Sequence, residues 1–142
     1  MSSRRGELAM ANILAIDDDS AVLATMKLLL ERDGHSIVVA NDSHKGLKIF
    51  ETGNFDLLVV DIFMPKMDGL ETLRLVHKRR PGIPIIVISG HAFPSDLNST
   101  PDFLHMATRL GAITSLRKPF KPADLLATVA RCLEASTNIS GS

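Results

Sequence analysis

The stretch LLVVD at residues 57–61 decides the fold of this chain, together with IIVIS at residues 85–89. In both stretches every position before the last is Leu, Val or Ile, with no alternation of polar and apolar residues. Uninterrupted apolar runs of this length are typical of strands in a parallel sheet whose two faces are both covered. The two stretches therefore predict a sheet with helices on both sides, and each run ends in a polar residue.

Five short apolar runs predict five strands, and apolar residues that recur every three or four positions predict five helices between and after them. The expected strands cover residues 12–16, 36–40, 56–60, 83–89 and 112–116, and the expected helices contain residues 22–30, 47–50, 70–76, 103–110 and 125–133. Strands that alternate with helices in this way indicate a doubly wound α/β domain. The last strand is the most polar, so we expect it at an edge of the sheet.

The composition argues against several classes of protein. The 142 residues include 16 basic and 16 acidic side chains, so the chain lacks the basic excess that is usual for proteins binding duplex DNA. No apolar stretch approaches the roughly 20 residues needed to span a bilayer, and the first residues do not form a secretory signal. The single cysteine, Cys132, fits a reducing compartment. We therefore expect a cytoplasmic protein with no direct nucleic-acid contact and no membrane contact.

The apolar pattern fills residues 12–134, which is enough for one domain. Residues 1–11 are interpreted as an N-terminal extension and residues 135–142 as a flexible, polar C-terminal tail, which leaves no room for an output domain. The isolated histidines show no metal-ligand spacing, and we expect four of them at the surface, namely His35, His44, His77 and His105.

Polar residues stand where four of the expected strands end. In doubly wound sheets, ligands bind beyond the carboxyl ends of the strands, near the change in strand order. The residues at these positions are Asp17, Asp18 and Asp19 after the first strand, Asp61 at the end of the third, Ser89 at the end of the fourth, and Lys118 after the fifth. We therefore expect several carboxylates, a hydroxyl group and an ammonium group along one rim.

This combination favours magnesium-dependent phosphoryl chemistry. Carboxylates held close together repel and raise each other's pKa unless a cation lies among them. Mg²⁺ prefers oxygen ligands and commonly binds through a few carboxylates together with phosphate oxygens. Asp61 is then the candidate nucleophile that forms an aspartyl phosphate, while the metal ion and Lys118 neutralise the oxygens of the transferred group.

Each of these residues alone has a simpler explanation. An Asp run after a strand is often a solvated turn that caps the next helix, and Asp19 or Ser20 is expected to do so here. Taken alone, Asp61 would be a strand-end residue and Lys118 a solvated lysine, while Ser89 would be uninformative. Their predicted meeting on one rim is what favours a functional site.

Four motifs carry a resemblance to a known family. They are ILAIDDDS at residues 13–20, LLVVDIFMPKMDGL at 57–70, IIVISGHA at 85–92 and SLRKPF at 115–120. In content and order they resemble the response-regulator receiver family of bacterial two-component signalling, over roughly residues 12–133. The resemblance implies a flavodoxin-like fold, with a five-stranded parallel sheet in the order 2-1-3-4-5 and five helices. It also implies a phosphoprotein of the stand-alone, chemotaxis-regulator type, which receives its phosphoryl group from a histidine kinase or a histidine phosphotransfer protein and then binds a downstream protein.

The resemblance assigns roles to individual residues. Asp61 becomes the phosphoacceptor, Ser89 the hydroxyl group that moves toward the phosphoryl group, and Lys118 the lysine that pairs with it. The metal ligands that it implies are Asp17, Asp18, Asp61 and the backbone carbonyl of Phe63, with Asp18 the more direct ligand of the acidic pair. The Lys-Pro bond of the family is usually cis, so the same is expected at Pro119.

Three features depart from the family pattern, and the first two lie between Ser89 and Lys118. Three residues before Lys118, where the family has an aromatic switch residue, this chain has Ser115, so a rotating aromatic ring cannot transmit the signal. The segment between Ser89 and Lys118 is also several residues longer than usual. Residues 93–101 within it are either a surface loop insertion, which loops tolerate easily, or a remodelled helix face that selects a partner.

The third departure is at Phe63 and His91, which occupy the variable positions that tune the lifetime of the phosphoryl group in the family. Three other functions compete with that of a receiver. A phosphatase of the haloacid-dehalogenase type would have a second Asp two residues after the nucleophile, where this chain has Phe63. A flavin or nucleotide binder on the same fold would have a Ser/Thr/Gly-rich loop after the first strand, where this chain has carboxylates. A receiver that binds partners without phosphorylation is favoured by Ser115 and disfavoured by the intact site. We therefore expect a binding module that catalyses only its own phosphorylation and dephosphorylation.

Overall fold

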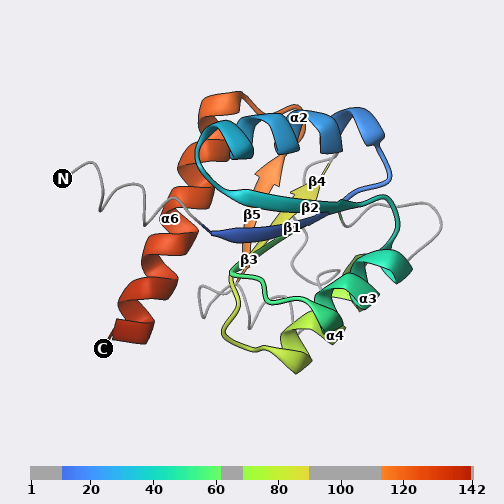
Figure 1. Ribbon diagram of the computed structural model, residues 1–142, viewed down its shortest axis with the longest axis vertical. Coiled ribbons are helices and arrows are strands. Elements are labelled where there is room, and N and C mark those ends of the chain that lie inside the picture. Colours follow the sequence, from blue (N-terminus) through green and yellow to red (C-terminus); the bar gives the residue numbers. More distant parts are fainter. Residues whose placement is uncertain (1–10, 62–68, 90–112, 142) are drawn as a thin grey trace, which may run out of the picture.

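The computed structural model describes residues 11–61, 69–89 and 113–141. These residues form β1 (Asn12–Ile16), α2 (Ser20–Arg32), β2 (Ser36–Ala40), α3 (Ser43–Thr52), β3 (Leu57–Asp61), α4 (Gly69–Arg79), β4 (Ile85–Ser89), β5 (Ile113–Arg117) and α6 (Pro122–Gly141). The five strands form one parallel sheet in the order β2-β1-β3-β4-β5, with helices on both faces (Figure 1). The predicted flavodoxin-like, doubly wound fold is therefore confirmed.

The boundaries of three strands differ from the prediction by one or two residues. β3 and β5 each begin and end one residue later than expected, and β4 begins at Ile85 rather than at residue 83. Pro84 explains the late start of β4, because proline has no N–H group to donate to the neighbouring strand. Its carbonyl oxygen still accepts a hydrogen bond from the Leu58 N–H, at 3.1 Å. The helix predicted at 103–110 lies outside the described residues.

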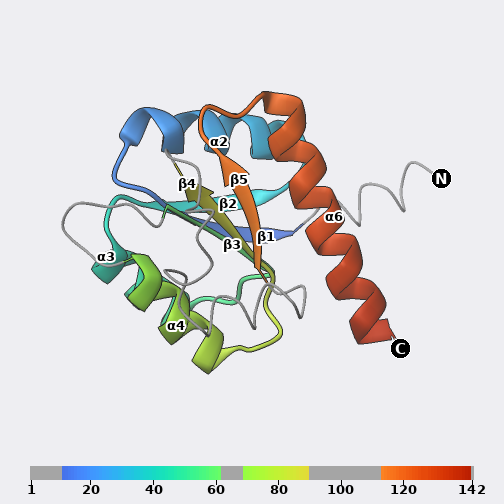
Figure 2. The ribbon, with the colours of Figure 1, turned by 180° about the vertical axis from the view of Figure 1, so that it is seen from behind.

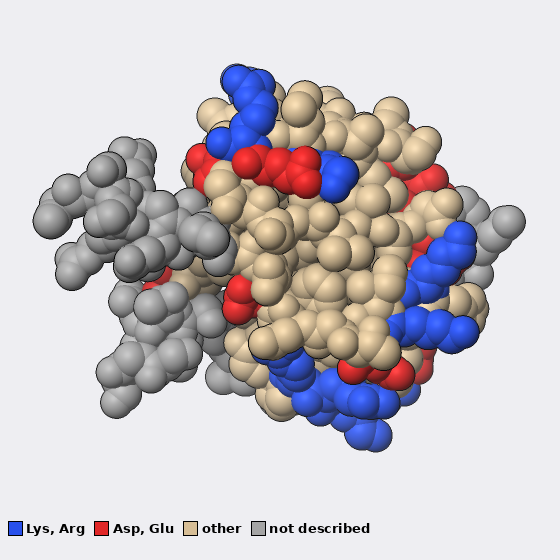
Figure 3. All heavy atoms as spheres, viewed as in Figure 1, with Lys and Arg blue, Asp and Glu red and all other residues tan. Residues whose placement is uncertain are grey.

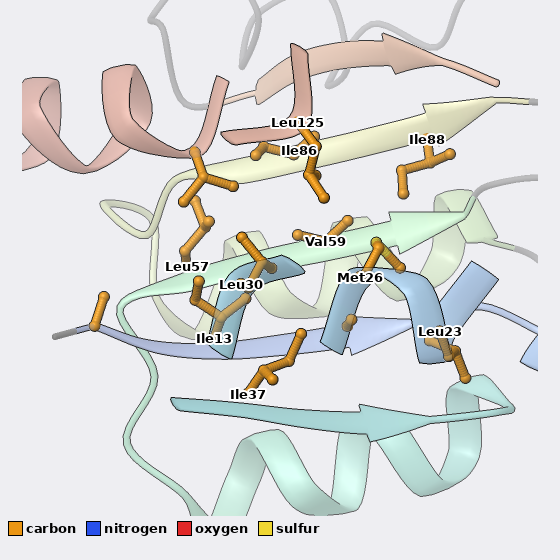
Figure 4. Packing of buried hydrophobic residues seen from close by; sticks show 13 residues of the cluster. Ile13, Leu23, Met26, Leu30, Ile37, Leu57, Val59, Ile86, Ile88 and Leu125 are labelled. Atoms are coloured by element: carbon orange, nitrogen blue, oxygen red, sulfur yellow. The ribbon is translucent and has the colours of Figure 1, made fainter. Parts of the chain in front are cut away.

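The continuous apolar strands fill two cores because successive side chains point to opposite faces of the sheet. Leu58 and Val60 of β3 belong to the core under α3 and α4, whereas Leu57 and Val59 belong to the core under α2 and α6. Figure 4 shows the second core, in which Met26 and Leu30 of α2 and Leu125 of α6 lie over Val59. Burying one such side chain fully contributes roughly 1.5–3 kcal/mol, so the two-sided strands anchor the domain.

Two of the helices that cover the sheet, α2 and α3, are capped by aspartates. Asp19 caps α2, and its Oδ1 accepts hydrogen bonds from the N–H groups of Ala21 and Val22, at 3.0 and 3.3 Å. Asp42 caps α3 in the same way, with its Oδ1 2.8 Å from the Lys45 nitrogen. After α2, Gly34 takes a φ of 98°, a left-handed conformation that favours glycine at the end of a helix.

The last helix is longer than predicted. α6 begins with Pro122 as its first residue and runs to Gly141, whereas the sequence predicted a flexible tail from residue 135. No glycine or proline interrupts residues 123–140, so the backbone has no strong stop signal before Gly141. In Figure 2 this helix passes β5 and extends beyond the sheet. None of the helices in the described ranges is long and apolar enough to cross a membrane.

The prediction that His35 lies at the surface is wrong. This histidine is only 7% exposed, and its Nδ1 accepts a hydrogen bond from the Ala11 N–H at 3.3 Å. The turn between α2 and β2 brings His35 beneath the start of β1, where the Ser36 N–H also donates to the Ala11 carbonyl oxygen. Burial here depends on a tertiary contact that no local pattern encodes.

Candidate functional site

The register of the sheet brings two aspartates to the same level at its carboxyl end. Ile16 of β1 pairs with Val60 of β3, so the next residues, Asp17 and Asp61, are neighbours. Asp17 is fully buried and Asp61 is 4% exposed, whereas the adjacent Asp18 is exposed to solvent. One carboxylate oxygen from each of the three lies within 4.8 Å of the others. The structure thus gathers three of the carboxylates that the sequence placed on one rim.

Lys118 supplies the positive charge of this rim. It follows β5, and its Nζ lies 2.9 Å from Asp17 Oδ2 and 3.1 Å from Asp61 Oδ2. The bond between Lys118 and Pro119 is cis, as predicted. Burial lowers the pKa of the lysine, but its contacts with the two carboxylates outweigh that effect and hold the pKa above the usual value. Lys118 therefore stays charged between the two buried aspartates.

Asp17 is the most constrained carboxylate of the site. Its Oδ1 accepts a hydrogen bond from the Asp19 N–H at 2.9 Å. Its Oδ2 is close enough to Lys118 for an ion pair, but the alignment does not make a hydrogen bond, so among the described residues this buried oxygen lacks a hydrogen-bond partner. Burial raises the pKa of Asp17 to about 6, and the bond from Asp19 and the charge of Lys118 only partly oppose it. A second cation beside Asp17 would stabilise its charged form.

The donor set fits a hard divalent cation. Within the described part of the chain, three carboxylates face a single ammonium group, and an oxygen of Asp17 is buried without a hydrogen bond. Hard cations such as Mg²⁺ prefer carboxylate oxygens and often keep several waters, which the exposed position of Asp18 allows. The residues that could hold such an ion are Asp17, Asp18 and Asp61.

The other predicted site residues are placed in part or not at all. Ser89 is the last residue of β4 and pairs with Arg117 of β5, so its backbone lies at the same end of the sheet, but its side chain is outside the described part. Ser115 lies in β5 and is exposed. Phe63, His91 and the insertion at 93–101 lie outside the described residues, and their roles stay predictions.

Two supporting features were not predicted. The bond from the Asp19 N–H to the Asp17 side chain is a local turn that aspartate often forms with the backbone two residues ahead, so the Asp-x-Asp spacing could have indicated it. Gly46 in α3 is buried against Ile16, and a β-carbon at position 46 would overlap the Ile16 side chain. This close approach fixes the strand end from which Asp17 projects, and it leaves no clear signal in the sequence.

Comparison with known sequences agrees with this geometry. The family described as "Response regulator receiver domain" matches residues 13–130. The transcriptional regulatory protein GlrR of Escherichia coli (strain K12) is 32% identical over 126 residues, which are 89% of this chain and 27% of GlrR. The alkaline phosphatase synthesis transcriptional regulatory protein PhoP of Bacillus subtilis (strain 168) is 30% identical over 124 residues, which are 87% of this chain and 49% of PhoP. The chain thus spans between about a quarter and a half of these relatives.

Solved structures of similar size share the fold. A CheY-like response regulator receiver domain protein from Methanospirillum hungatei has a TM-score of 0.78 and 32% identity, covering 91% of this chain and 98% of its own. The response regulator TrrA from Thermotoga maritima, solved in complex with Mg²⁺-BeF, has a TM-score of 0.72 and 27% identity, covering 87% of this chain and 99% of its own. Both likenesses cover most of this chain and nearly all of the other chain.

Proposed function

The chain belongs to the response regulator receiver domain family, and from this premise we propose that Asp61 accepts a phosphoryl group from a histidine kinase or a histidine phosphotransfer protein, in an Mg²⁺-dependent reaction. The observation that supports this most is the convergence at one rim of three carboxylates within 4.8 Å, with the Lys118 ammonium 3.1 Å from Asp61. In the structure of TrrA, Mg²⁺ accompanies the complex with BeF.

Asp61 is the nucleophile in this proposal. One of its carboxylate oxygens forms a bond to phosphorus as the phosphorus–nitrogen bond of the donor phosphohistidine breaks, and the imidazole leaves with the electron pair. Lys118 offsets the negative charge on the phosphoryl oxygens from its place beside Asp61. A bound Mg²⁺ adds Lewis-acid neutralisation of the same oxygens. Asp17 and Asp18 would hold that ion, and the hydrogen bond from the Asp19 N–H orients Asp17 for the task.

The result is a change in binding rather than turnover of a substrate. The phosphoryl group carries about −1.5 to −2 charges, but the Asp61 carboxylate loses its own charge when it is phosphorylated, so the rim gains roughly one negative charge at most. The Ser89 hydroxyl group and Lys118 are the groups that respond to the phosphoryl group. Phe63 and His91 would tune how long the phosphoryl group persists. We propose a signalling module of the cytoplasm that passes the signal to a downstream protein, with Ser115 in place of an aromatic switch.

Intact-mass spectrometry after incubation with acetyl phosphate tests the proposal. The wild-type chain is expected to gain the mass of one phosphoryl group with Mg²⁺ present, and much less after chelation. Asp61→Asn is expected to gain nothing, because an amide of nearly the same shape is no nucleophile. The matched control is Asp56→Asn, since Asp56 is an exposed aspartate before β3 at the opposite end of the sheet. Phosphoryl uptake by Asp61→Asn with unchanged stoichiometry would rule out the assignment.

A further inference from the structure

Strand β2 leaves one edge of the sheet open. It is the first strand in the order β2-β1-β3-β4-β5, so among the described strands it pairs with β1 alone. The Ser36 N–H donates to the Ala11 carbonyl oxygen at 2.9 Å, which shows that Ser36 turns its backbone groups toward β1. Neighbouring residues of a strand alternate in this respect, so the N–H and C=O groups of Ile37 and Val39 point to the open side.

This edge lacks the devices that usually discourage pairing. Natural edge strands carry charged residues, prolines or bulges, but β2 reads SIVVA, whereas β5 at the opposite edge ends with the exposed Arg117. The most exposed large hydrophobic residues of the described part are Leu28 of α2 and Val38 of β2, at 58% and 42%. Figure 3 looks onto this edge, and the middle of the face is uncharged while Lys, Arg, Asp and Glu form its border.

A groove of about 480 Å³ adjoins the open edge, between α2 and α3. Its walls include Leu23 and Ala24 of α2, Val39 of β2 and Ile49 of α3, so its interior is largely apolar. Its volume lies within the range of about 300–1,000 Å³ that is typical of ligand pockets. Because Val39 also turns its backbone outward, a chain that pairs with β2 can place a side chain in this groove.

Two lysines give the groove a positive rim. Lys27 comes from α2 and Lys45 from α3, and both line the groove. Lys27 Nζ lies 2.9 Å from Glu31 Oε2 in an exposed pair, and Lys45 Nζ lies 3.3 Å from Asn41 Oδ1. Exposed pairs of this kind are weak, so both ammonium groups can turn to a stronger partner.

We propose that the β2 edge binds an extended, acidic segment of a partner protein. The segment adds a strand to the sheet through the backbone of Ile37 and Val39, inserts an apolar side chain into the groove, and sets a carboxylate against Lys27 or Lys45. A second copy of this chain fits less well, because β2 offers no carboxylate to these lysines and a symmetric pair would bring like charges together. Asp61 does not line the groove, so the contacts made by the segment do not include the phosphoacceptor.

A titration of the ¹⁵N-labelled full chain with a short, blocked peptide in which glutamate and valine alternate tests the proposal. Saturable amide shifts are expected at Ile37, Val39, Ala24 and Ile49. The double variant Lys27→Glu/Lys45→Glu is expected to weaken binding by at least about tenfold, because two attractions become repulsions. The matched control is Lys78→Glu, since Lys78 is an exposed lysine of α4 that does not line the groove.

Two further peptides distinguish strand pairing from general stickiness. A peptide that alternates lysine and valine is expected not to bind, and neither is the glutamate peptide after N-methylation of its backbone. Equal binding of either peptide, or shifts that fall outside β2 and the groove, would overturn the proposal. The proposal would also be overturned if the chain dimerises in sedimentation experiments, the dimer is lost when Val38 is replaced, and the glutamate peptide does not bind. The occupant of the edge would then be a second copy of the chain.

Discussion

The two ends of the parallel sheet hold their polar groups in opposite ways. At the carboxyl end, Asp17 is buried with a pKa raised to about 6, and one of its oxygens lacks a hydrogen bond. At the amino end, the polar groups pair with one another. The Asn12 N–H donates to Asp56 Oδ2 at 2.8 Å, the Asp56 N–H donates to the Asn12 carbonyl oxygen at 2.7 Å, and the Ala11 N–H donates to His35 Nδ1.

The difference separates reactivity from stability. A buried carboxylate beside other carboxylates lowers the stability of the fold until a cation arrives, so it is tolerated only where chemistry requires it. The amino end has no such requirement, and each of its hydrogen bonds contributes about 0.5–1.5 kcal/mol. Substitutions at the two ends should therefore affect different measurements.

Magnesium affinity is expected to show the largest effect, and only at the carboxyl end. Asp18→Ala should weaken Mg²⁺ binding by at least about tenfold in calorimetry, and Asp17→Ala should weaken it less, following the direct and indirect roles that the family pattern implies. Asp56→Ala at the amino end should leave the affinity unchanged. Equal affinity in all four proteins would remove the metal site from the carboxyl end.

Substitution of Asp17 is expected to raise the free energy of unfolding in the absence of metal, although it should lower the affinity for Mg²⁺. In chelator, Asp17→Asn should raise the free energy of unfolding at pH 8 by about 1–2 kcal/mol, because burial disfavours the charged carboxylate that the amide replaces. The lost ion pair with Lys118 keeps the gain below the full effect of burial. Urea unfolding followed by circular dichroism measures it. A less stable variant in chelator would show that Asp17 is already satisfied by its protein contacts.

The sequence predicted the carboxyl end better than the amino end. Asp17, Asp61 and Lys118 were predicted to converge because strand ends in a parallel sheet meet at one edge, so knowing the strands is enough to place them. His35 was misplaced, because its burial depends on how the α2–β2 turn packs under Ala11. A single histidine in a polar turn carries no periodic signal of such a contact.

Local sequence signals predicted where elements begin better than where α6 ends, because no glycine or proline marks the end of that helix before Gly141. The two-sided strands β3 and β4 were predicted from their uninterrupted apolar runs, and Pro84 could have given the start of β4. The predicted end of α6 was too early, because its last turns are polar and carry no apolar stripe. A helix can continue through such residues without an apolar stripe. The role of Gly46 could not be predicted, because a glycine inside a helix usually destabilises that helix, whereas here it allows close packing on Ile16.

Acidification should lower the stability contributed by the amino end and raise that contributed by the carboxyl end. Burial lowers the pKa of His35 below its usual 6.5, and the charge of Asp33 only partly opposes this. The unfolded chain then binds the proton more readily, so the stability from neutral His35 is present above pH 6.5 and is lost as the pH falls below it, by at most about 1.4 kcal/mol per pH unit. Asp17 acts oppositely, because its pKa of about 6 exceeds its ordinary 3.8, so acidification through pH 6 favours the folded state.

Unfolding free energies measured from pH 8 to pH 5 in the Asp17→Asn background isolate the histidine. His35→Gln should flatten the acid loss there, while His44→Gln, at an exposed position of α3, should leave it unchanged. An acid loss that persists in His35→Gln would assign it to another group and remove the pH response from the amino end.

The smallest effect is expected for Asp56→Asn, and it tests whether the two ends are independent. The amide oxygen can still accept the hydrogen bond from the Asn12 N–H, but the bond loses the strength that a charged acceptor gives it, and the site is exposed. We expect a loss of about 0.5–1 kcal/mol in urea unfolding, with an unchanged dependence on denaturant. Phosphoryl uptake should stay complete, whereas the same substitution at Asp61 is expected to abolish it while the fold survives. Reduced uptake in Asp56→Asn at full occupancy of the folded state would mean that the amino end of β3 controls the geometry of Asp61, five residues along the same strand segment. The division between a stabilising end and a reactive end would then fail.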